Sequence, residues 1–78
     1  MNTKKLSQMS KNQSGIVYEV GGDVFIKRRL LELGFVRGAS VKVLSVSPLG
    51  NTSLVCLQDY VLALRKTSLD FVLVIENV

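Results

Sequence analysis

The chain has 78 residues and a formal net charge of +4, which comes from ten basic and six acidic side chains. This length allows one domain with a thin core. A single cysteine excludes an intrachain disulfide, and the lack of histidine leaves too few ligands for an ordinary zinc site. The core must therefore rest on apolar residues, which make up 47% of the chain.

The N-terminal segment differs in composition from the rest of the chain. Residues 1–14 are rich in Lys, Ser, Asn and Gln and predict a polar, partly mobile arm, with the folded domain over residues 15–78. Leu6 and Met9 leave two alternatives open, a helical turn docked on the core or a disordered segment. The arm carries three lysines and no acid, so the remaining seven basic and six acidic residues make the folded part nearly neutral.

A strand and then a helix are predicted next. Residues 16–20 are a β-prone run closed by two glycines. Asp23 has the position of a helix N-cap, and Gly34 suits the left-handed residue that ends a helix. Between them, apolar residues recur at the spacing of one buried helical face, made of Ile26, Leu30 and Leu33.

Beyond residue 38 the apolar period changes to two, which is typical of strands. Val41 and Val43 are one residue out of phase with Leu44 and Val46, and this predicts a bulge near Val43-Leu44. Turn residues then separate three more strands, expected over residues 54–57, 60–64 and 71–75. The sequence therefore predicts a mostly β fold, a small five-stranded barrel with one inserted amphipathic α-helix.

Catalysis has little support in the side chains available. General acid–base chemistry most often uses histidine, which is absent, and no two acids lie close in sequence. Cys56 lies in an apolar run without a neighbouring base, which favours a buried structural cysteine over a nucleophile. The glycine spacings match no phosphate-binding loop. We expect a binding protein that is not an enzyme and has no cofactor and no metal site.

Two exposed features are candidates for partner contact. The basic run at residues 27–29 falls on the outer side of the helix, where it forms either a solvated face or a docking surface. Leu49 stands between Pro48 and Gly50 in a turn, where it is either tucked under the loop or exposed as a contact residue. The candidate contact residues are Lys27, Arg28, Arg37, Pro48, Leu49 and Gly50.

The order of these pieces over residues 6–75 resembles the FeoA family, the small cytoplasmic components of bacterial ferrous iron uptake. The matching segments are Ile16–Val20, Arg29–Phe35, Arg37-Gly38, Ser47–Gly50, Ala63–Arg65 and Val72–Val74. The resemblance implies an SH3-like barrel that acts on FeoB, a membrane transporter with a cytosolic GTP-binding domain, as an accessory or regulatory subunit. It implies a cytoplasmic protein, recruited to the inner face of the membrane by its partner without inserting into it, and no catalytic residues.

Other functions remain as alternatives. The sequence departs from the family pattern after the turn, where Asn51-Thr52 replaces the common Asp-Pro. A pI of about 9.6 and the basic arm favour a small nucleic-acid-binding barrel as the second interpretation. A metal sensor is a third interpretation, but the sequence offers too few metal-ligating residues for it. The FeoA-type module also occurs as the C-terminal domain of iron-dependent repressors of the DtxR type. We expect no nucleic acid as a partner, and weak self-association stays open.

Overall fold

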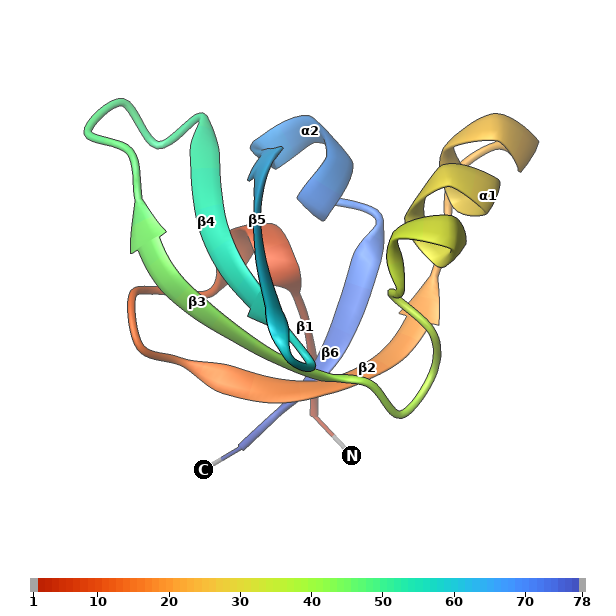
Figure 1. The fold of residues 1–78 in the computed structure, drawn as a ribbon, viewed down its shortest axis with the longest axis horizontal. Coiled ribbons are helices and arrows are strands. Elements are labelled where there is room, and N and C mark those ends of the chain that lie inside the picture. The colour runs from red at the N-terminus through yellow and green to blue at the C-terminus, as the bar shows by residue number, and fades with distance from the viewer. Residues whose placement is uncertain (1, 78) are drawn as a thin grey trace.

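Six antiparallel strands form one curved sheet in the order β1-β6-β2-β3-β4-β5 (Figure 1). The computed structural model describes residues 2–77. The elements in chain order are β1 (Thr3–Lys5), the 3-10 helix η1 (Leu6–Gln8), β2 (Ser14–Val20), α1 (Val24–Leu33), β3 (Ser40–Val46), β4 (Thr52–Leu57), β5 (Tyr60–Arg65), α2 (Lys66–Leu69) and β6 (Val72–Glu76). The predicted mostly β class is confirmed, with one strand and one short helix more than expected.

The additional strand lies in the segment that was expected to be an arm. β1 pairs with β6, with Thr3 opposite Ile75. Leu6 and Met9 are 1% and 3% exposed, so the docked turn, not the disordered segment, is what the structure shows. The described part of residues 1–14 thus shares the sheet and core of the domain, and the expected boundary at residue 15 does not separate them. Residues 1 and 78 lie outside the described chain.

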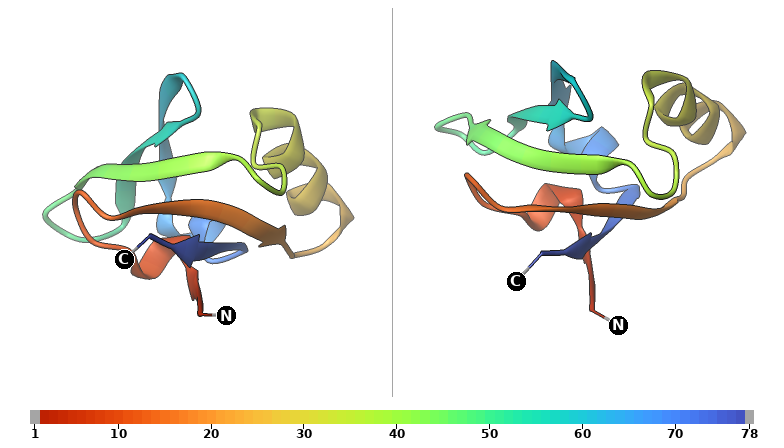
Figure 2. Two further views of the ribbon diagram at one scale, coloured as in Figure 1. Left: turned by 90° about the horizontal axis from the view of Figure 1, so that it is seen from below. Right: turned by 60° about the horizontal axis from the view of Figure 1, so that its bottom comes forward.

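Two irregularities in strand pairing curve the sheet. The β3–β4 register shifts between Val43 and Ser45, which confirms the predicted bulge, and the β2–β6 register shifts between Val17 and Glu19. Bulges bend a strand and increase its twist. The sheet therefore curls around its core as Figure 2 shows, while β1 and β5 remain its two outer strands in the part of the chain that the structure describes.

Helix α1 forms as its capping residues predict. The Asp23 carboxylate accepts a hydrogen bond from the Ile26 amide at 2.9 Å, and Gly34 ends the helix with a φ of 113°. Leu30 is 2% exposed and enters the core, with Ile26 and Leu33 packed at its margin. Neither α-helix within residues 2–77 is long and apolar enough to cross a membrane.

The core fills the inside of the curled sheet. All six strands except β1 and β5 contribute fully buried side chains, and η1, α1 and α2 close it. Its buried apolar residues are Leu6, Met9, Val17, Val20, Leu30, Phe35, Ala39, Val41, Val43, Val55, Leu57, Leu69, Val72 and Val74.

Three segments reach the same side of the molecule. The first turn of α1, the short helix α2 and the β3–β4 loop all lie at the top of Figure 1. The two ends of the described chain lie together on the opposite side. We call the side that carries α1, α2 and the loop the upper side.

Candidate functional site

The β3–β4 loop presents a leucine to solvent from a braced turn. Leu49 is 88% exposed, which settles the two alternatives for its position in favour of exposure. Ser47 holds the loop on both sides: its amide donates to the Thr52 carbonyl at 2.8 Å, its carbonyl accepts from the Gly50 amide at 2.8 Å, and its hydroxyl donates to Asn51 Oδ1 at 2.9 Å. These bonds hold the loop backbone in a conformation that leaves the Leu49 side chain exposed.

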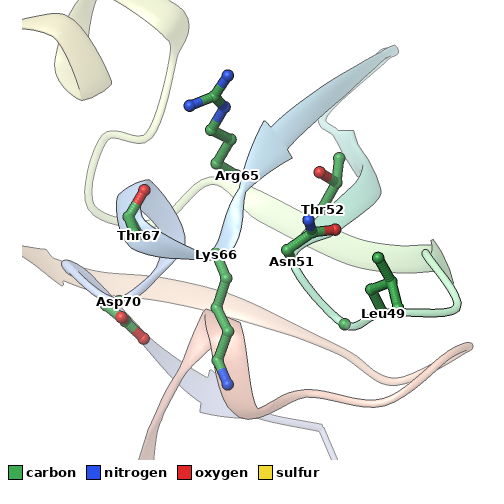
Figure 3. Close-up of a pocket in the computed structure, with 8 residues that line it drawn as sticks. Leu49, Asn51, Thr52, Arg65, Lys66, Thr67 and Asp70 are labelled. Atoms are coloured by element: carbon green, nitrogen blue, oxygen red, sulfur yellow. The ribbon is translucent and has the colours of Figure 1, made fainter.

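A shallow concavity of about 590 Å³ lies between this loop and α2 (Figure 3). The Lys66 amide donates to the Asn51 carbonyl at 2.9 Å and ties the start of α2 to the loop. Figure 3 shows the side chains of Arg65 and Lys66 pointing to opposite sides of the chain. The concavity is lined by Leu49, Gly50, Asn51, Thr52, Arg65, Lys66, Thr67 and Asp70.

A second groove of about 540 Å³ separates α1 from the end of β5. Arg65 lines this groove as well as the concavity beside the loop, so it stands between the two. The groove is lined by Ile26, Arg29, Leu30, Leu33, Ala63, Leu64, Arg65 and Ser68. The upper side is therefore a row of loop, α2 and α1 with basic side chains between them.

The structure does not bring all the sequence-predicted residues together. Pro48, Leu49 and Gly50 share the loop, whereas Lys27 and Arg28 lie exposed on α1. Arg37 lies in the connection between α1 and β3, and its guanidinium carbon is 4.7 Å from the centroid of the Tyr18 ring. A cation held over an aromatic face has a structural partner already. Partner contact by any of these residues stays a prediction.

Some exposed residues of the upper side were not singled out from the sequence. Val24 and Phe25 in the first turn of α1 are 67% and 81% exposed. Both lie off the buried stripe of Ile26, Leu30 and Leu33, so the helical periodicity already indicated that their side chains would be exposed. Arg65 and Lys66 carried no such signal, because their neighbourhood with Leu49 depends on the pairing of β4 with β5.

The acidic side chains and Cys56 are the remaining metal-binding or reactive residue types of the described chain. Within residues 2–77, no three His, Cys, Asp or Glu side chains lie together as a metal ion would require. The prediction that Cys56 is buried is wrong. Val55 and Leu57 point into the core, so the alternation of β4 turns Cys56 to the other face, where it is partly exposed.

Comparison with known proteins places this fold and sequence in a family. The model of the FeoA domain matches residues 4–76. A fusion of Fe(2+) transport protein A with the Fe(2+) transporter FeoB, from Porphyromonas gingivalis, is 29% identical over 62 residues, which cover 80% of this chain and 7% of the relative. The chain thus spans a small part of that protein.

Two solved structures show the same fold. FeoA from Stenotrophomonas maltophilia, crystallised with zinc and described as a prokaryotic SH3 domain protein, is 33% identical, with a TM-score of 0.77 over 95% of this chain and 89% of that chain. A manganese-dependent transcriptional repressor in complex with manganese is 14% identical, with a TM-score of 0.90 over 99% of this chain and 38% of that one, a likeness of fold alone. The chain belongs to the FeoA family, which is associated with ferrous iron transport, and its fold is SH3-like.

Proposed function

We propose that this protein is a cytoplasmic accessory subunit of ferrous iron uptake, without catalytic activity, that binds the cytosolic side of a FeoB-type transporter. The relative in which FeoA and FeoB form one polypeptide supports this partner, because proteins joined in one chain commonly work on each other. The observation that carries the contact site is Leu49, which is 88% exposed on a loop that its own hydrogen bonds hold in place.

The loop has the properties of an interface anchor. A side chain on a backbone that is already held in place costs less conformational entropy on binding than one on a mobile loop. Interface energy usually concentrates in a few central residues surrounded by contacts that contribute little. Here Arg65 and Lys66 line the concavity next to Leu49, and their charges would steer an acidic partner surface toward the loop.

Iron uptake measured in cells tests the proposal. Cells that lack this protein are supplied with the native chain, with Leu49→Asp, or with Val61→Asp, and the rate of ferrous iron entry is compared. Val61 is the matched control because it is also apolar and exposed, at 52%, but lies on β5 near the β4–β5 turn. We expect the native chain and Val61→Asp to restore uptake and Leu49→Asp to fail.

Purified components separate binding from transport. The native chain should be retained by detergent-solubilised FeoB, and Leu49→Asp should be lost while its circular dichroism stays native. Retention of Leu49→Asp at the native level removes the loop from the contact. Uptake that does not depend on this protein at all contradicts the accessory role itself.

A further inference from the structure

The first turn of α1 exposes apolar side chains that the fold does not use. Phe25 is 81% exposed and Val24 is 67% exposed. Neither packs against the core, which α1 reaches through Leu30, Ile26 and Leu33. Exposed large apolar side chains next to each other mark sites of interaction.

Basic side chains lie near this apolar tip. Four exposed cations lie on α1 and beside it at the end of β5: Lys27, Arg28, Arg29 and Arg65. The Cα–Cβ bonds of a helix tilt toward its N-terminus, so the long side chains of residues 27–29 lean toward the first turn. The one ion pair found within residues 2–77 joins Lys4 to Glu76, on the side of the chain ends, and leaves these four cations without an acidic partner.

Few acids oppose these cations. Asp23 caps α1 through the Ile26 amide, and Asp70 accepts a hydrogen bond from the Ser7 hydroxyl. Glu32 lies at the other end of α1, at the last turn. The charge of this end of the upper side is therefore complementary to an anionic surface.

We propose that the first turn of α1 docks on an anionic phospholipid membrane, with Phe25 and Val24 entering the headgroup region and the basic residues contacting lipid phosphates. Phe25 and Val24 stand at one tip of the molecule with four cations near them, and phospholipid phosphates supply the opposite charge. These two side chains suit a bilayer, because apolar side chains reach about 5–10 Å into its boundary and each nearby Lys or Arg adds electrostatic attraction. The contact is interfacial and crosses nothing.

The position of α1 agrees with the proposed transporter contact, and this one step rests on the proposed function. The first turn of α1 and the β3–β4 loop lie on the same side of the molecule (Figure 1). A protein that meets a membrane transporter through the loop therefore turns Phe25 toward the side on which the bilayer lies.

Tryptophan fluorescence offers a direct test, because the chain has no tryptophan. Single variants Phe25→Trp and Val61→Trp are mixed with vesicles of phosphatidylglycerol and phosphatidylcholine, or of phosphatidylcholine alone. We expect a blue shift for Phe25→Trp with the anionic vesicles at about 0.1 M salt and none at about 1 M, where charge screening extends about 3 Å. Val61→Trp should not shift. No shift of a folded Phe25→Trp variant, or an equal shift of Val61→Trp, overturns the proposal.

Charge variants test whether the cations of α1 contact the membrane directly or attract it only through the net charge of the protein. The pair Lys27→Gln and Arg28→Gln should lower the partition coefficient about thirtyfold, at the usual contribution of a basic residue near an anionic membrane. The pair Lys5→Gln and Lys42→Gln removes the same charge from exposed positions on β1 and β3 and should lower it less than threefold. Equal losses in both pairs would show attraction by net charge alone and contradict a docking face.

The vesicles contain no transporter, so failure here leaves the FeoB contact intact. Conversely, vesicle binding by Phe25 says nothing in favour of Leu49. A shift of Phe25→Trp with the purified cytosolic domain of FeoB but not with vesicles would assign this face to a protein and overturn the lipid contact.

Discussion

The hydroxyl of Ser7 donates a hydrogen bond to Oδ1 of Asp70, across 63 residues of chain. Ser7 belongs to η1 and Asp70 directly follows α2, so the bond joins the N-terminal segment to the last turn before β6. Leu6, next to Ser7, and Leu69, next to Asp70, are both buried in the core. A partly buried polar contact thus joins the two segments whose apolar neighbours pack in the core.

Removing this bond should weaken the fold measurably. We expect Ser7→Ala to lower the free energy of unfolding by about 1–2 kcal/mol, because the partly buried carboxylate of Asp70 loses a donor. Denaturant unfolding measures the change. Ser10→Ala, an exposed position in the same segment, is the control and should stay within about 0.5 kcal/mol of the native chain. Equal values for both variants would show that the bond contributes nothing.

The inner face of α1 should carry most of its stabilising contribution. Leu30→Ala removes a side chain that is 2% exposed and should cost about 2–5 kcal/mol. Phe25→Ala on the same helix removes a larger side chain that is 81% exposed and should change stability by less than about 0.5 kcal/mol. Thermal or urea denaturation distinguishes them. A large loss for Phe25→Ala would mean that this ring packs on the protein.

Alanine substitutions at two glycines distinguish the cost of backbone strain from the cost of steric crowding. Gly38 has a φ of 94° and open space where a Cβ would stand, so Gly38→Ala should cost only the strain, about 1–2 kcal/mol. Gly34 has a φ of 113°, and its Cβ would lie 3.3 Å from Leu57 Cδ2 and from the Tyr60 hydroxyl. Gly34→Ala should therefore be the more destabilised of the two variants in urea. The reverse order would contradict this account of the helix end.

The loop variant should separate function from folding. Because Leu49 is 88% exposed, Leu49→Asp should leave the free energy of unfolding within about 0.5 kcal/mol of the native value while it abolishes transporter binding. Urea denaturation and retention by FeoB are measured on the same preparation. A destabilised Leu49→Asp chain would make any loss of uptake uninformative about the interface, and Leu49→Ser would then replace it.

The local parts of this fold were predictable because their signals are local. Asp23 and Gly34 bracket α1, and the phase change at Val43-Leu44 marks the bulge of β3. The two-residue turn at Gln58-Asp59 joins β4 to β5, with Gln58 in the left-handed region at a φ of 54°. Each of these features depends on only a few consecutive residues.

The parts that were missed depend on partners far along the chain. β1 has three residues, two of them lysines, and forms a strand only because it pairs with β6. α2 is a single turn between two strands and has no periodicity to detect. The concavity beside Leu49 gathers residues 49–52, 65–67 and 70, which meet only once β4 and β5 have paired. The residues of the loop were predictable, but the surface around it was not.

The pairing of Thr3 with Ile75 brings both ends of the described chain to the side away from α1 and Leu49. A linker attached at either end would therefore leave the upper side uncovered. Joining the domain to a second protein in this way raises the effective concentration of the loop at its target without altering any contact, provided that the linker spans the distance. The same geometry makes either terminus the place for an immobilisation tag, since a chain anchored there points Leu49 and Phe25 into solution.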